Sequence, residues 1–445
     1  MTSGAPAREL GFWMAVALVM GNMIGSGVFL LPAALAAYGG LSLVGWLVSA
    51  TGSVLLALVF ARLSRLHPAS GGMYAYTRRA FGDLPGFLVA WGYWISIWCA
   101  NAALAVAFVG YLDPFLPSIV RSPARAGMLA VATVWVLTAV NIASLRAAGR
   151  LQVVTTALKL LPLAVIALAG LTMFEPANFT IAEPDAATFS RHLMGVVTLT
   201  LWAFLGLECA TIPAASIRDP DRTIPRATLT GTVAAAVIYI VSTIGVMSLV
   251  PPATLASSTA PFADAARTIG GDRAAALVAL GAAISCFGAL NGWILIVGQL
   301  PLAVARDGLF PGFFSRLTAR GTPAAGMVLA GVLSTALIAM NYSRGLVALF
   351  TFIILLATLS TLVPYFLCSL AGLLAATGRL RAWQAVSTSA ALIAAGALIY
   401  SIVAIIGAGW EVISWGVVLI AAGLPVYVWM RLAPPKLGRS EGGRG

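Results

Sequence analysis

The chain has 445 residues, of which 60% are hydrophobic and only 9% are charged, and its formal net charge is +12. A soluble globular chain has about 45–50% apolar and about 25% charged residues, so this composition excludes a soluble domain and indicates a protein embedded in lipid. In a soluble protein the positive charge would suggest a nucleic-acid partner. In a membrane protein it indicates basic cytoplasmic loops, and we expect no nucleic-acid partner.

Twelve apolar stretches are long enough to cross about 30 Å of hydrocarbon as helices. We therefore expect an all-α polytopic membrane protein, in contact with the lipid bilayer along most of its length. Its twelve transmembrane helices are predicted near residues 11–36, 42–62, 85–112, 127–145, 151–173, 194–215, 227–250, 274–305, 325–341, 346–372, 384–409 and 413–432.

The basic residues divide unevenly between the two sides of this arrangement. If both termini are cytoplasmic, 19 of the 26 Lys and Arg residues fall on the cytoplasmic side, 6 fall on the other side, and Lys159 lies inside the fifth span. Cytoplasmic loops of membrane proteins are enriched in Lys and Arg. The bias therefore predicts that the N-terminal segment 1–10 and the C-terminal tail 433–445 are both cytoplasmic.

Spans one and six each contain a glycine-bearing interruption at mid-membrane depth, LVMGNMIGSGVFLLP and LWAFLGLECATIPAA. Glycines in membrane helices also allow close helix packing, but three small residues in a row at 25–27 favour unwound backbone, which is tolerated only beside protein or a cavity. Two breaks five spans apart predict a 5+5 inverted repeat of the leucine-transporter type, with discontinuous helices 1 and 6 at its site. Residues 11–173 would form the first repeat, 194–372 the second, and 384–432 two extra C-terminal helices.

The break in span one has a defined chemistry. After Gly25, the amides of Ser26 and Gly27 begin a new half-helix, whose unpaired N–H groups and dipole suit an anion such as an α-carboxylate. The carbonyls of Asn22 and Met23 end the first half-helix and suit an α-ammonium. In span six, the carbonyls near Trp202 and Leu205 have the same character. An amino acid head group fits these paired half-helix ends.

Lys159 and Glu208 are the sole formal charges that the predicted spans place at membrane depth, away from the span ends. A charged residue at the bilayer centre costs several kcal/mol, roughly 2.5–3.5 on insertion scales, and therefore usually has a functional reason. We expect Glu208 to sense protons and Lys159 to take part in coupling. The alternative is a structural ion pair between the two.

Several segments resemble the basic amino acid/polyamine antiporters of the amino acid–polyamine–organocation superfamily, most closely the arginine/agmatine antiporters of bacteria. The similarity is carried by GNMIGSGVFLLPA, LWAFLGLE and FGALNGW, and continues through GGMYAYTRRAFG, TAPFADAA, DGLFP and TLVPY. The resemblance implies a multi-pass protein of the bacterial inner membrane that assembles as a homodimer.

The resemblance also implies roles for individual residues. Trp202 would close over the substrate from outside, Trp293 would stack on its side chain as a middle gate, and Asn101 would contact its guanidinium end. An aromatic face attracts such a cation by about 0.5–2 kcal/mol. The alternatives are an interfacial or lipid-facing position for either tryptophan and a helix–helix hydrogen bond for Asn101.

In the same family a glutamate and two tyrosines act in pH sensing and in the inner gate, and Glu208, Tyr93 and Tyr365 match them. The chain departs from the arginine/agmatine pattern at Lys159, and at the side-chain end of the pocket. There it has Ser96 and Ile97, Leu104 replaces a methionine, and Ala357 replaces a serine.

These observations predict a secondary active transporter that exchanges an arginine-like amino acid for its agmatine-like amine by alternating access. The alternative is proton-coupled uptake or exchange of neutral amino acids using Lys159. We expect no enzyme activity, no cofactor and no metal, because clustered His, Asp or Cys residues at membrane depth are missing from the sequence. A channel is disfavoured, because two breaks at one depth suit an occluded site.

Overall fold

The computed structural model describes residues 8–180, 186–340, 346–380, 383 and 386–432, and the side chains in these ranges apart from 186–188, 191, 340 and 346–358. The described residues form helices joined by turns, with a single isolated β-bridge between Leu10 and Ile217. An all-helical membrane protein was expected, and the fold class is confirmed at this level.

Ten helical segments of the described chain are long and apolar enough to cross a membrane. They are α1 (Phe12–Met23) with α2 (Gly27–Ala36), α3 (Leu41–Leu66), α5 (Asp83–Gly110), α7 (Pro123–Ala143), α8 (Leu145–Thr172), α10 (Pro220–Leu249), α12 (Pro261–Arg306), α14 (Leu346–Ala376), α15 (Thr388–Gly407), and α16 (Trp410–Ala421) with α17 (Gly423–Leu432). Two further apolar helices, α9 (Ala186–Trp202) and α13 (Ala324–Met340), are shorter.

Three short helices lie between the long ones: α4 (Met73–Phe81), α6 (Pro117–Val120) and α11 (Pro252–Ala256). Helix α12 begins thirteen residues before its predicted start and contains a non-helical step at Gly270 and Gly271. Gly271 has φ +65°, which L side chains rarely adopt, so the glycine ends the first segment and lets the span begin in a new direction.

The predicted span 194–215 is α-helical as far as Trp202, and its second part, expected to continue the span after the interruption, does not form an α-helix. Turns and two short 3₁₀ segments, η2 (Cys209–Thr211) and η3 (Ala214–Ser216), follow it. Gly206 has φ +112°, and Pro213 has no N–H to donate, so an α-helix cannot continue through these residues.

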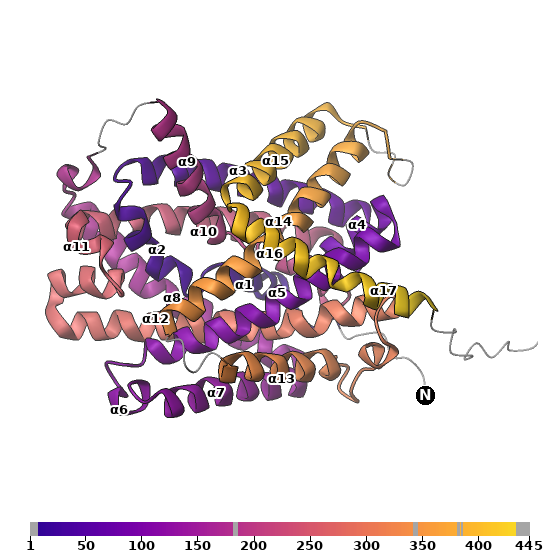
Figure 1. Ribbon diagram of the computed structural model, residues 1–445, viewed down its shortest axis with the longest axis horizontal. Helices are drawn as coiled ribbons and strands as arrows, with labels where there is room; N and C mark the ends of the chain where they lie inside the picture. Colours follow the sequence, from indigo (N-terminus) through magenta and orange to yellow (C-terminus); the bar gives the residue numbers. More distant parts are fainter. Residues whose placement is uncertain (1–7, 181–185, 341–345, 381–382, 384–385, 433–445) are drawn as a thin grey trace, which may run out of the picture.

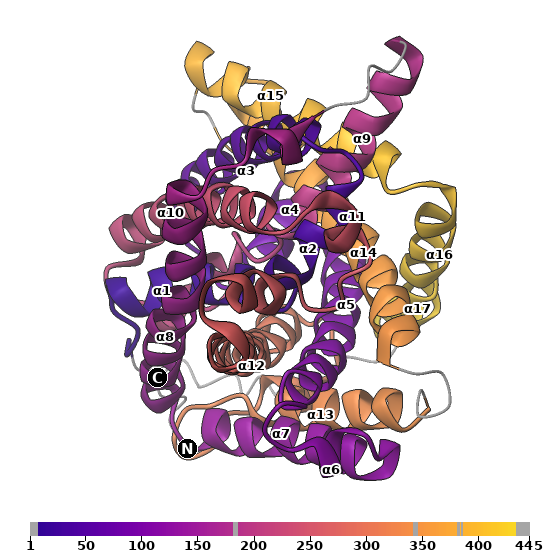
Figure 2. The ribbon, with the colours of Figure 1, turned by 90° about the vertical axis from the view of Figure 1, so that its left-hand side faces the viewer.

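Helices α1 and α2 lie inside the bundle, and α1 packs against α8, α10 and α12 (Figures 1 and 2). The apolar window of the α1–α2 span is 89% buried, whereas that of the α16–α17 span is 17% buried. The broken span is thus enclosed by protein, which is the condition under which unwound backbone is tolerated at membrane depth. The last span has a largely apolar surface available for lipid.

Segments predicted to be cytoplasmic meet at one end of the molecule. Helix α4 and the end of α17 lie at the right in Figure 1, whereas α6 and α11 lie at the left. At the α4 end, Arg78 forms ion pairs of 2.7 Å with both Asp83 and Asp307, and Arg431 pairs with Asp83. These pairs join α4, α5, α17 and the end of α12.

Candidate functional site

The chain between α1 and α2 is unwound over three residues, Ile24, Gly25 and Ser26. A helix end leaves its last carbonyls without internal partners, so their partners show what the break can bind. Gly25 N–H donates back to Met23 O at 3.0 Å, and the remaining carbonyls are reached by side chains from other helices.

Lys159, from the middle of α8, takes two of these carbonyls. Its Nζ donates to Gly21 O at 2.9 Å, to Ile24 O at 2.5 Å and to Ser285 O at 3.3 Å. Ser285 Oγ donates to Ile24 O at 2.9 Å and to Gly25 O at 3.1 Å. The Lys159 side chain is 0% exposed, and these oxygens stabilise its buried ammonium.

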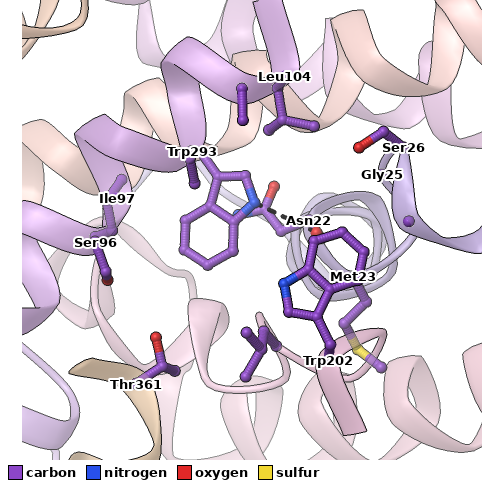
Figure 3. Close-up of a pocket in the computed structure, with 14 residues that line it drawn as sticks. Asn22, Met23, Gly25, Ser26, Ser96, Ile97, Leu104, Trp202, Trp293 and Thr361 are labelled. Atoms are coloured by element: carbon purple, nitrogen blue, oxygen red, sulfur yellow. Dashed lines mark hydrogen bonds between the residues drawn. The ribbon is translucent and has the colours of Figure 1, made fainter. Parts of the chain in front are cut away.

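A third side chain reaches the same helix end. Trp293, in α12, donates its indole N–H to Asn22 O at 3.3 Å (Figure 3). The carbonyls of Asn22 and Met23 were predicted to receive a substrate ammonium. In this structure both already accept a hydrogen bond, from Trp293 and from Gly25 N–H.

On the α2 side of the break, the backbone N–H groups lack such partners within the described chain. The backbone amides of Ser26, Gly27 and Val28 reach no acceptor among the described residues, although all three residues are buried. A buried donor without a partner costs about 1–3 kcal/mol. An anion placed here would gain three N–H groups at the N-terminus of α2.

Trp202, the last residue of α9, covers this amide end. A Cβ on Gly27 would collide with the Trp202 ring, so the ring can lie there only because residue 27 is glycine. Beyond Trp202, the positive φ of Gly206 turns the chain against α1, where a Cβ would lie 3.2 Å from the carbonyl carbon of Asn22. Leu205 O accepts no hydrogen bond from the described residues and remains available to a donor.

Glu208 lies in the unwound segment after Gly206 and is 0% exposed. Its carboxylate accepts hydrogen bonds from the hydroxyls of Tyr93 and Tyr365 and, at 3.2 Å, from Gly206 N–H. The three residues matched to an inner gate are therefore brought together. Glu208 forms no ion pair with Lys159 in the described part of the chain, so the structural ion pair considered as an alternative is not formed here.

The Tyr93 ring also contacts Trp293, with ring centroids 6.4 Å apart in an edge-on arrangement. Tyr93 therefore touches both Glu208 and the proposed middle gate. A change at the carboxylate can reach Trp293 through a single side chain.

A narrow cavity lies between the two breaks and α5 (Figure 3). Its lining includes every predicted substrate-binding residue except Asn101 and Ala357. Those that line it are Asn22, Met23, Gly25, Ser26, Gly27, Ser96, Ile97, Trp202, Leu205 and Trp293. None of the lining side chains carries a formal charge.

The two exceptions have different reasons. Asn101 lies in α5 and is 2% exposed, but it does not line the cavity, and its Oδ1 accepts no hydrogen bond from the part of the chain that the structure describes. Ala357 lies in α14, and its side chain is outside the described residues.

Leu104, expected at the side-chain end of the pocket, lines the cavity. Three further lining residues were not predicted: Ala100, Ala103 and Thr361. Ala100 and Ala103 continue the face of α5 that contains Ser96 and Ile97, at helical spacings of three and four. Thr361 follows Ala357 by one turn of α14. Helical periodicity from the predicted contacts was a signal that could have found all three.

A cavity enclosed between two interrupted helices defines a class of membrane transporter rather than an enzyme. The amino acid permease family model matches residues 10–430, so the chain belongs to that family. Together with the candidate spans, this makes it a multi-pass protein of the bacterial inner membrane.

The chain is similar to characterised relatives along most of its length. It is 37% identical to the cadaverine/lysine antiporter of Escherichia coli K12 over 81% of this chain and 82% of the relative. It is 35% identical to the putrescine transporter PotE of Haemophilus influenzae over 91% and 93%, and 34% identical to PotE of Escherichia coli K12 over 82% and 83%. The predicted superfamily and transport class are confirmed. The closer resemblance to arginine/agmatine antiporters stays a prediction.

Proposed function

We propose that this protein exchanges a cationic amino acid for the amine formed by its decarboxylation, by alternating access, one substrate at a time. The observation that carries the proposal is the set of three buried amides without acceptors at Ser26, Gly27 and Val28. Ser26 and Gly27 line the cavity, together with Trp202 and Trp293. The amides suit a carboxylate, and the rings suit a cationic side chain.

A lysine-like substrate is favoured over the arginine-like one expected from sequence. Asn101, the residue expected to contact a guanidinium, does not line the cavity. The distal part of the cavity has the hydroxyls of Ser96 and Thr361. An ammonium has three donors, whereas a guanidinium has five in a fixed plane and would leave more of them unpaired. Relatives that carry cadaverine and lysine or putrescine support the same ranking.

Further parts of the proposal concern architecture and gating. The two shorter apolar helices, α9 and α13, complete twelve spans in two inverted repeats of five, followed by two helices. Both termini lie in the cytoplasm, and the protein works as a homodimer. Trp202 acts as the outer gate, Trp293 as the middle gate, and Glu208 with Tyr93 and Tyr365 as a pH-responsive inner gate.

The second candidate function is proton-coupled uptake or exchange of neutral amino acids. It is favoured by one observation, which is that no carboxylate among the described residues lines the cavity to neutralise a cationic side chain. In this reading Lys159 is the coupling amine, because its ammonium holds both Gly21 O and Ile24 O at the break.

Exchange in proteoliposomes separates the two functions. Vesicles containing the purified full-length protein are loaded with unlabelled lysine, and entry of labelled lysine is measured against external competitors. We expect lysine, cadaverine, arginine and agmatine to compete, with the lysine pair more effective than the arginine pair. Dominant competition by leucine or alanine would overturn the proposal in favour of the second function.

A further inference from the structure

The two poles of the break differ in how far the protein itself fills them. On the amide side, three buried N–H groups have no described acceptor. On the carbonyl side, the C=O groups of Gly21, Asn22, Met23 and Ile24 each accept a hydrogen bond from the protein, and Gly25 O shares the single hydroxyl proton of Ser285 with Ile24 O. The pole expected to bind an ammonium thus already has protein donors.

Among the side chains that donate to these carbonyls, Trp293 differs from the others. Lys159 and Ser285 lie behind the break and do not line the cavity, whereas Trp293 lines it. A substrate can therefore meet the Trp293 donor without disturbing the two behind it.

We propose that the indole N–H of Trp293 occupies the ammonium-binding position at Asn22 O in the empty transporter, and that the substrate ammonium displaces it. This rests on the function proposed above. Trp293 is then an internal competitor of the substrate as well as an aromatic surface for its side chain.

The packing shows which partner is held in place. Asn22 is buried, and its Nδ2 donates to Cys209 Sγ at 3.1 Å, whereas the contact between Gln152 Nε2 and its Oδ1 is a longer 3.4 Å. Gly292, directly before Trp293, has no Cβ, and a Cβ there would collide with Asn22 Oδ1. Helix α12 can therefore approach α1 closely enough for the neighbouring indole to reach the backbone.

The indole is the partner that can yield. Its bond to Asn22 O is 3.3 Å long, at the weak end of the N–H···O range. In Figure 3 the ring lies in the middle of the cavity between Ser96 and Ile97 on one side and Gly25 and Ser26 on the other. A ring in this position must move when a substrate extends from the break toward α5.

Displacement of the indole N–H predicts the direction in which substrate affinity changes when that N–H is removed. The substrate ammonium replaces an existing hydrogen bond, so removing the indole N–H while keeping the ring should strengthen binding. A neutral intramolecular hydrogen bond contributes a net free energy that corresponds to roughly two- to tenfold in affinity. A purely stacking or structural role for Trp293 predicts unchanged or weaker binding instead.

The test uses two variants of the full-length protein. Trp293→Phe keeps an aromatic face but is smaller. Replacement of Trp293 by benzothienylalanine keeps the bicyclic ring and exchanges the N–H for sulfur. The matched control is Trp94→Phe, which removes an indole donor of the same kind to Val297 O, at 3.2 Å between α5 and α12, outside the cavity lining.

Lysine and cadaverine binding is measured by isothermal titration on purified protein, and exchange is measured in proteoliposomes. We expect the Kd for both ligands to fall about two- to tenfold in the benzothienylalanine variant, with exchange retained, and to stay unchanged in Trp94→Phe. For Trp293→Phe, the smaller ring subtracts from the gain, so its Kd should lie above that of the benzothienylalanine variant.

An unchanged or higher Kd in the benzothienylalanine variant, with normal binding and exchange in the wild type, would overturn the competition by Trp293 and leave the proposed function intact. Failure of the wild-type protein to bind either ligand would overturn the proposed function, and this inference with it.

Discussion

The two glycines of the Gly25-Ser26-Gly27 run should tolerate a methyl group very differently. An alanine Cβ at residue 25 meets Leu104 Cδ2 at 3.3 Å and Ala289 Cβ at 3.7 Å, and the end of a leucine side chain can move by a few tenths of an ångström. An alanine Cβ at residue 27 falls inside the Trp202 ring. Gly27→Ala therefore forces Trp202 away from the break, whereas Gly25→Ala does not.

The size of the effect follows from overpacking a tight contact. Overpacking costs about 1–3 kcal/mol. If that cost falls on the closed position of Trp202, the KM for lysine exchange should rise about fivefold to 150-fold in Gly27→Ala. For Gly25→Ala, whose neighbours are flexible or distant, we expect a smaller rise in KM of at most about tenfold, since well-tolerated volume changes cost under about 1.5 kcal/mol.

The assay is initial-rate exchange of labelled lysine in proteoliposomes over a range of external concentrations, with protein content matched by immunoblot. Trp202→Ala is the reference for a lost outer gate. The reasoning is refuted if Gly27→Ala and Gly25→Ala show the same KM, or if Gly25→Ala is the more damaged of the two.

Three shorter predictions concern the charged residues. Glu208→Gln replaces one carboxylate oxygen, an acceptor between Tyr93 and Tyr365, by an NH₂ group that donates. The rate of exchange should then depend less on pH in the mildly acidic range. An unchanged pH profile would assign Glu208 a structural role alone. Lys159→Ala leaves Gly21 O without its hydrogen-bond donor, so the rate of exchange of lysine-like substrates, measured in the same vesicles, should fall but remain detectable. Complete loss of exchange would favour the transport of neutral amino acids. Asp307→Asn weakens the ion pair with Arg78, whose two side chains are about one-third exposed, so the thermal unfolding midpoint should hardly change. A large drop in that midpoint would contradict a minor role for this pair.

The position of the break in the first span could be predicted from the sequence, because unusual residues mark it. Glycines at 25 and 27 identify the break, and Lys159 and Glu208 are conspicuous in a chain with so few charges. The partners of Lys159 could not be predicted, because they are backbone oxygens on α1 and α12 that only the packing of α8 brings within reach.

Other features depended on backbone geometry or on neighbours far away in the chain. The end of α9 at Trp202 reflects the positive φ of Gly206, which a glycine in sequence permits but does not require. Asn101 lies outside the cavity because of the rotation of α5 about its axis, and a fraction of a turn separates it from the residues that line the cavity. Helical spacing from Ile97 and Leu104 could not decide it, because both neighbours line the cavity and Asn101 does not.

The contrast between the two poles of the break also bears on how one site can serve an amino acid and its amine. The two substrates share an ammonium but differ in the carboxylate, and the amides of Ser26, Gly27 and Val28 have no described acceptor until a carboxylate arrives. Each hydrogen bond to a charged group contributes about 1.5–3 kcal/mol, so a single recovered bond predicts that lysine binds at least about tenfold more tightly than cadaverine.

Lysinamide isolates the contribution of the carboxylate to binding, because it keeps the α-ammonium and side chain of lysine but has a neutral amide in place of the carboxylate. We expect its Kd, measured by isothermal titration, to lie between those of lysine and cadaverine. Equal affinities for all three ligands would show that the amides of α2 do not bind the carboxylate. Tighter binding of cadaverine than of lysine would refute the orientation of the head group across the break.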